Sequence, residues 1–292
     1  MTPCTPIPLG RTGATLGESP TWAPEENAVY WIDVIGRRVH RHDLGTGNAR
    51  VYPVGGIPSA IALGRGGLVV VLRNGLALLD TVSGAETPLK LDFDFGNERF
   101  NDAAPDREGR LFVGSMDRRM TDPVGGLWRI DPDLGITRVA RGTILGNGIA
   151  WSPDDRTLYF CDSRAGLVHA HAFDAATGEV RDGRVHLDLR QTGAHPDGCA
   201  MDAEGCLWVA EMPTGTIGRY DPGGHRIDEI RLPVPRVTSM AFCGPDLSQL
   251  CITTMRYGLS DDALAATPLA GCTFLAESGV RGLPVPLCAL RA

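Results

Sequence analysis

The chain has 292 residues, 43% of them hydrophobic and 22% charged, with a formal net charge of -7. This acidic balance argues against nucleic acid and anionic membranes as partners, because both attract basic surfaces. No run approaches the roughly 20 apolar residues that a membrane-spanning helix needs, and the first ten residues lack a signal-peptide pattern, so we expect a cytoplasmic protein. The eight cysteines are scattered through apolar runs without paired spacing, which predicts reduced thiols in the core.

Short apolar and aromatic runs alternate with turns along the chain, which contains 37 glycines and 21 prolines. No long amphipathic helix is present, so the pattern predicts an all-β fold. Residues 101–117, 147–163 and 197–212 share one plan of strand, tight turn and strand. A second hairpin follows, with a strand that ends in an aspartate before a Gly or Pro turn at Asp43, Asp131, Asp174 and Asp221. Four strands per repeat is the composition of a propeller blade.

A polar or acidic residue at the start of the first strand recurs every 41 to 50 residues, and we call these six residues the anchors: Glu18, Ser59, Asn101, Asn147, Asp197 and Ser239. Six anchors at this period predict a single domain over residues 1–292, an all-β six-bladed β-propeller with four antiparallel strands per blade. We expect residues 271–277 and 287–291 to form closing strands, and residues 5–15 to add the outer strand of the last blade. A two-sheet sandwich would explain the strands but not the repeat.

The innermost strands of a propeller line its channel, so the anchors are predicted to form a ring around one mouth. Ser59 and Ser239 are explained as caps of their strands. Glu18, Asn147 and Asp197 bring two carboxylates and an amide oxygen together, and the carboxylates repel each other unless a cation lies between them. Oxygen ligands suit Ca²⁺, Mg²⁺ or Mn²⁺, and three protein ligands leave positions open for water and substrate, as in catalytic sites.

Five segments in order give the chain a resemblance to a known family: LGESP at 16–20, YWID at 30–33, RFND at 99–102, GNGIAWSPD at 146–154 and PDG at 196–198. The chain resembles the SMP-30/gluconolactonase/luciferin-regenerating group, and within it the bacterial sugar lactonases. The resemblance implies a six-bladed propeller that binds one divalent ion through Glu18, Asn147 and Asp197. It also implies that Arg99 and Asn101 contact a sugar, whereas the alternative for Arg99 is a surface ion pair with Glu98.

The chain departs from the family where regucalcin-like members carry acidic residues that touch substrate. Here the sequence reads Asp117, Arg118 and Arg119, so a different sugar is expected and Arg119 becomes a candidate substrate contact. His195, just before the PDG segment, is predicted either to contact substrate or to cap its loop.

The function implied by the resemblance is metal-dependent hydrolysis of a sugar lactone, an aldono-1,4- or 1,5-lactone of a pentose or hexose, to the aldonic acid in sugar catabolism. The cofactor would be one Ca²⁺, Zn²⁺, Mn²⁺, Mg²⁺ or Fe²⁺ ion, with Asp197 or metal-bound hydroxide as the base. The expected partner is the small-molecule lactone, and the expected state is a monomer or weak homo-oligomer. The alternatives are a non-catalytic, calcium-binding regucalcin-like protein and a lactonase or esterase for a non-sugar ester.

Two His-x-His pairs, at residues 40 and 42 and at residues 169 and 171, have a spacing that could also bind Zn²⁺. Both occupy the same place in their repeats, away from the predicted channel. We therefore expect them on exposed blade surfaces and not in metal sites.

Overall fold

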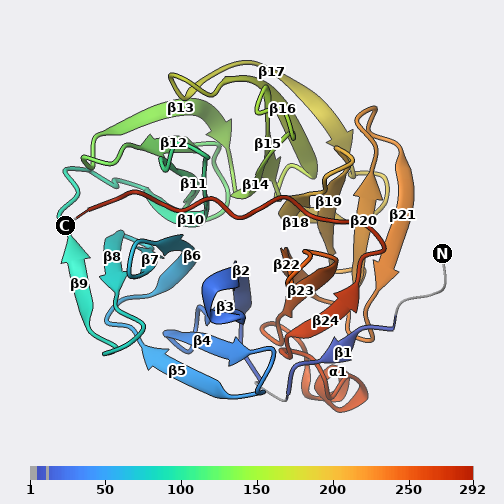
Figure 1. The fold of residues 1–292 in the computed structure, drawn as a ribbon. Coiled ribbons are helices and arrows are strands. Elements are labelled where there is room, and N and C mark those ends of the chain that lie inside the picture. Colours follow the sequence, from blue (N-terminus) through green and yellow to red (C-terminus); the bar gives the residue numbers. More distant parts are fainter. Residues whose placement is uncertain (1–4, 11–12, 292) are drawn as a thin grey trace.

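The computed structural model describes residues 5–10 and 13–291. Its strands form six four-stranded antiparallel sheets. Figure 1 shows these sheets arranged as blades around a central channel. The predicted six-bladed β-propeller is confirmed. Within the described residues, no helix is long and apolar enough to cross a membrane.

The strands of each blade are given in order from the channel outward. The first blade contains β2 (Gly17–Ala23), β3 (Ala28–Asp33), β4 (Arg38–Asp43) and β5 (Ala49–Pro53). The second contains β6 (Pro58–Gly64), β7 (Gly67–Leu72), β8 (Gly75–Leu79) and β9 (Glu86–Leu89). The third contains β10 (Glu98–Pro105), β11 (Leu111–Asp117), β12 (Gly125–Ile130) and β13 (Ile136–Thr143). The next two contain β14 (Gly146–Trp151), β15 (Thr157–Asp162), β16 (Leu167–Asp174) and β17 (Glu179–Asp188); and β18 (His195–Met201), β19 (Leu207–Met212), β20 (Thr216–Tyr220) and β21 (Arg226–Arg231). The last blade contains β22 (Val237–Cys243), β23 (Gln249–Thr254), β24 (Phe274–Glu277) and β1 (Ile7–Pro8).

The N-terminal strand β1 closes the ring by pairing with β24 in the last blade. Ile7 pairs with Leu275 and Pro8 with Phe274, so the N-terminal segment supplies the outer strand as predicted, although residues 11–12 lie outside the described chain. The expected strand at 287–291 is wrong. This segment runs across the channel face (Figure 1) and makes a single bridge, from Cys288 to Gly64. The reason is that β1 already occupies the edge of β24 that a closing strand would need.

Aspartates fix the turns that follow the third strand of several blades. The carboxylate of Asp43 accepts from the backbone N–H groups of Gly45 and Thr46, at 3.0 and 2.8 Å. Asp174 accepts from those of Ala176 and Thr177 in the same way. A side chain that satisfies two turn amides favours the reversal over strand continuation, which explains the recurring aspartate. The described helices are short, a 3-10 turn η1 (Pro24–Glu26) and α1 (Asp261–Ala266).

The core lies between blades, where apolar faces of neighbouring sheets pack together. His40 belongs to this interior. It is 7% exposed and its ring stacks on that of Trp31 with centroids 5.2 Å apart, so its expected place on an exposed surface is wrong. Burial lowers the pKa of His40 to about 4, with a smaller effect from Arg38. The cysteines at positions 161, 199, 206, 243, 251 and 288 are free thiols, as predicted, and Cys4 lies outside the described residues.

Candidate metal centre and substrate site

All six anchors lie in the innermost strands, and each of these strands has a β-bulge at or next to its anchor. In β14, for example, Asn147 pairs with Cys161 and Ile149 pairs with Phe160 of β15. Two steps along β14 therefore match one step along β15, and the extra residue is Gly148. A bulge interrupts the alternation of side chains between the two faces of a strand and re-aims them. The bulges therefore let polar anchors face the channel mouth from strands whose other residues build the core.

Glycines next to two anchors let neighbouring blades approach each other. Gly148 has a φ of +26°, and a Cβ on it would lie 2.5 Å from the carbonyl oxygen of Asp197. A Cβ on Gly198 would lie 2.8 Å from the Cα of Ser239 in the next blade. Side chains cannot come this close to a backbone, so both positions require glycine.

A chain of hydrogen bonds connects side chains from three blades at this mouth. Nη1 of Arg99 donates to Oδ1 of Asn101 at 3.2 Å, and Nδ2 of Asn101 donates to Oδ1 of Asn147 at 3.2 Å. Nδ2 of Asn147 in turn donates to Oδ1 of Asp197. The structure thus brings together four of the site residues predicted from the sequence.

Three carboxylates share this region of the channel. Burial raises the pKa of Glu18, and the negative charges of Asp197 and Asp102 raise it further. Burial also raises the pKa of Asp197, with Asp102 as the second cause. The pKa of Asp102 itself is raised to about 6 by burial, although the N–H groups of Ala103 and Gly148 oppose the shift. Across the described chain, none of the three forms an ion pair with a basic side chain.

This set of residues fits a hard divalent cation. Grouped carboxylates without a counter-ion are costly, and carboxylate and amide oxygens are the ligands that Ca²⁺ and Mg²⁺ prefer. In the described chain, no three Asp, Glu, His or Cys side chains are gathered closely enough to hold an ion. The amide oxygen of Asn147 is therefore needed beside Glu18 and Asp197. A bound cation would neutralise Asp197, whose Oδ1 accepts a hydrogen bond from Nδ2 of Asn147 in this structure.

The other predicted site residues differ in how close they come to this centre. Glu98 pairs with Arg138 and not with Arg99, so the alternative of a surface ion pair for Arg99 is wrong. Nδ1 of His195 lies 3.0 Å from the carbonyl oxygen of Ser163, which favours the loop-capping interpretation. Arg119 is exposed on the turn after β11, and its side chain makes no hydrogen bond within the described residues.

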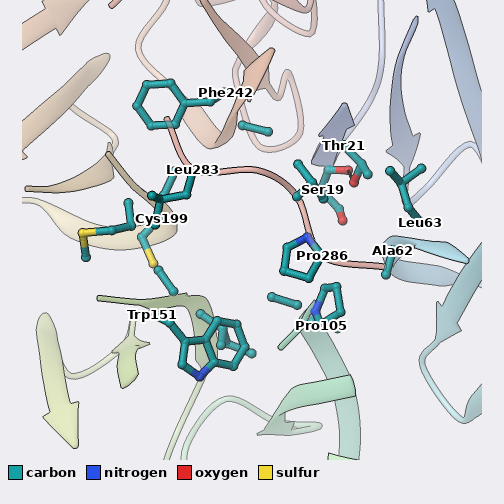
Figure 2. Close-up of a pocket in the computed structure, with 18 of the residues that line it drawn as sticks. Ser19, Thr21, Ala62, Leu63, Pro105, Trp151, Cys199, Phe242, Leu283 and Pro286 are labelled. Atoms are coloured by element: carbon teal, nitrogen blue, oxygen red, sulfur yellow. Dashed lines mark hydrogen bonds between the residues drawn. The ribbon is translucent and has the colours of Figure 1, made fainter. Parts of the chain in front are cut away.

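The C-terminal segment crosses one face of the propeller (Figure 1). A cavity of about 190 Å³ lies there, lined mainly by apolar side chains, and residues 283–286 of the C-terminal segment cover it. Figure 2 shows Leu283 and Pro286 of this segment among the lining side chains, which include Cys199 and Trp151. Asp102 lines the cavity, whereas Glu18, Asn147 and Asp197 do not. We therefore expect substrate to reach the anchors from the opposite mouth.

The sequence did not single out Asp102 or Ser163. Asp102 follows Asn101 directly, and in a regular strand two consecutive side chains point to opposite faces. The bulge between Phe100 and Ala103 removes that restriction. The carboxylate of Asp102, directly after Asn101 in the RFND segment, was the feature of the sequence that could have indicated its place at the site. Ser163, whose hydroxyl accepts from Nδ2 of Asn147 at 3.0 Å, had no comparable signal.

The fold is that of the six-bladed β-propellers, with acidic and amide side chains in its innermost strands. Within that class, the chain belongs to the SMP-30/gluconolactonase/LRE-like family, whose model matches residues 16–256.

The chain is 34% identical to regucalcin from Gallus gallus over 285 residues, which cover 94% of this chain and 95% of that protein. It is 33% identical to a 6-deoxy-6-sulfogluconolactonase from Pseudomonas putida, covering 96% and 97%. A crystal structure of regucalcin from Agrobacterium tumefaciens, described as a calcium-binding protein, superposes with a TM-score of 0.92 at 32% identity, covering 99% and 98%. The resemblance identified from the sequence is confirmed.

Proposed function

We propose that this protein hydrolyses the ring ester of a sugar lactone at the anchor mouth of its channel, with the help of one divalent cation. The observation that carries the proposal is the group of three carboxylates, none of which has a basic partner among the residues that the structure describes, next to the hydrogen-bonding side chains of Arg99 and Asn101. Family membership and the named lactonase among its relatives support the choice of reaction.

The residues that would hold the cation are Glu18, Asn147 and Asp197. When bound, such an ion polarises a carbonyl oxygen and lowers the pKa of water. In this proposal the carboxylate of Asp197 accepts a proton from the attacking water, and the charge of Asp102 raises the pKa of Asp197 after burial. Water adds to the carbonyl carbon, the bond from that carbon to the ring oxygen breaks, and the ring oxygen takes up a proton to become a hydroxyl.

Arg99 and Asn101 would orient the substrate. The Arg99 guanidinium is partly buried and donates to Asn101 and to the carbonyl oxygen of Phe100, which leaves further N–H groups for ring hydroxyls. A polyhydroxylated lactone offers acceptors for these groups, whereas an apolar ester does not.

A pH-indicator assay of several aldonolactones, run with Ca²⁺, Zn²⁺, Mn²⁺, Mg²⁺ and Fe²⁺ and after exhaustive chelation, tests the proposal. We expect acceleration with at least one sugar lactone and loss of that rate on chelation. Retention of the full rate after chelation would refute the metal-dependent mechanism.

The second candidate function is calcium binding without catalysis, which the regucalcin relatives favour. Calcium binding measured by calorimetry, together with no hydrolysis of any lactone tested, would select it.

A further inference from the structure

Three arginines that form no ion pair within the described part of the chain lie near Asn101, and one of them is Arg99. Arg73 follows β7 in the second blade, whereas Arg99 and Arg118 lie at the ends of β10 and β11 in the third. Figure 1 shows these two blades side by side. We call Arg73, Arg99 and Arg118 the rim arginines.

Hydrogen bonds place the rim arginines together across the gap between the two blades. The carbonyl oxygen of Arg73 accepts from the N–H of Phe100 at 3.0 Å, which sets Arg73 beside the start of β10. Nη2 of Arg118 donates to Oδ1 of Asn74 at 2.7 Å, which brings the β11–β12 turn to the residue next to Arg73. Burial first, and then the charges of Arg73 and Arg118, lower the pKa of Arg99 to about 10.

The three guanidinium groups differ from most of the buried arginines in their lack of a paired carboxylate within residues 5–10 and 13–291. The described chain contains no ion pair of Arg73, Arg99 or Arg118, and Nε of Arg73 is buried without a hydrogen-bond partner there.

Three carboxylates close to Arg99 and Arg118 in the sequence have other partners. Asp117 accepts from the N–H groups of Thr121 and Asp122 in its own turn. Asp94 accepts from the N–H of Gly96, and Glu98 pairs with Arg138. Three guanidinium groups near one another, in a protein whose net charge is -7, therefore form a local site for an anion.

We propose that the substrate is an anionic lactone, with a phosphate, sulfonate or carboxylate on the carbon farthest from the carbonyl, and that the rim arginines bind this group. The proposal rests on the lactonase function proposed above and specifies its substrate class. Arg99 connects the two regions, since it donates to Asn101, which donates to Asn147. A ligand with its carbonyl at the metal centre can thus direct its far end toward Arg73 and Arg118. Guanidinium groups match these anions with paired hydrogen bonds, which neutral hydroxyls accept more weakly.

The test compares kcat/KM for glucono-1,5-lactone with that for its 6-phospho and 6-deoxy-6-sulfo derivatives. We expect the anionic lactones to be preferred by about tenfold or more, because a hydrogen bond to a charged group contributes more than one to a neutral group. Arg118→Gln and Arg73→Gln should each remove most of that preference and leave the rate with glucono-1,5-lactone unchanged. Higher ionic strength should also reduce the preference, because Arg118 is exposed. The ratio of kcat/KM for the 6-phospho lactone to that for the 6-deoxy-6-sulfo lactone shows which of these two anions the site prefers.

The matched control is Arg164→Gln. Arg164 is an exposed arginine on the β15–β16 turn, at the same end of its blade, and makes no side-chain hydrogen bond among the described residues. It should alter none of the rates. Equal kcat/KM for neutral and anionic lactones would overturn the anion site and leave the lactonase function intact, as would equal effects of Arg118→Gln and Arg164→Gln.

If no lactone is hydrolysed, the proposed function fails and calorimetry decides the anion site separately. Tighter binding of 6-phosphogluconate than of gluconate, lost in Arg118→Gln but not in Arg164→Gln, would support it. Equal binding of the two acids would overturn it.

Discussion

The substitution Asp102→Asn tests two effects of the Asp102 charge, the loss of folding stability that it causes and the cation affinity that it supplies. The pKa of Asp102 is raised from 3.8 to about 6, so folding disfavours its ionised form. A shift of about two pKa units corresponds to about 3 kcal/mol of unfolding free energy. We discount this to about 1–2 kcal/mol, because the side chain is only partly shielded from solvent. Asparagine has nearly the same shape, and its Oδ1 can still accept from the N–H of Ala103.

The sign of the pH dependence follows from the raised pKa. Below about pH 4, Asp102 is protonated in both the folded and the unfolded chain and has no effect. As the pH rises from about 4 through 6, the unfolded chain loses its proton first, so the metal-free protein loses stability, and above about pH 7 the loss is complete. Asp102→Asn should therefore raise the melting temperature of the chelated protein at pH 8 by about 2–6 °C and leave it unchanged at pH 4.

The same substitution should weaken cation binding, because it removes one negative charge from the centre. We expect about a tenfold loss of Ca²⁺ affinity. Thermal unfolding with chelator from pH 4 to pH 8, and calorimetric Ca²⁺ titration, measure the two effects. Asp92→Asn, on an exposed loop, is the control and should change neither. Equal melting temperatures for Asp102→Asn and the wild type in chelator at pH 8 would show that Asp102 carries no buried charge.

Three further predictions concern the centre and the closure of the fold. Asp197→Ala should abolish lactone hydrolysis while circular dichroism still shows the folded propeller, and a wild-type rate with added metal would remove Asp197 from the mechanism. Gly148→Ala should cost more than about 1 kcal/mol in urea unfolding, since it combines a positive φ with a clash, whereas Gly47→Ala, in an open turn, should cost less. Deletion of residues 1–9 should expose the edge of β24 and cause association detectable by light scattering, and a monodisperse product of unchanged stability would contradict the closing role of β1.

The sequence alone was sufficient to predict the six-bladed fold. A polar anchor every 41 to 50 residues, between short apolar runs, predicted the blade count and placed Glu18, Asn147 and Asp197 on inner strands. These features depend on local periodicity and turn chemistry, which one chain displays directly. The segment at 287–291 shows where such reasoning ends, because its apolar pattern suits a strand but the sheet edge was already occupied by β1.

The tertiary structure decided which side chains meet. The link from Asn101 through Asn147 to Asp197 joins residues 46 and 50 positions apart, and it depends on the bulges and on the angle between blades. The burial of His40 against Trp31 and the direction of Asp102 were set in the same way. Two of the rim arginines were visible in the sequence, Arg99 in the RFND segment and Arg118 beside a departure from the family pattern. Arg73 joined them because two blades pack side by side, and contacts between strands distant in sequence are fixed by packing and not by local pattern.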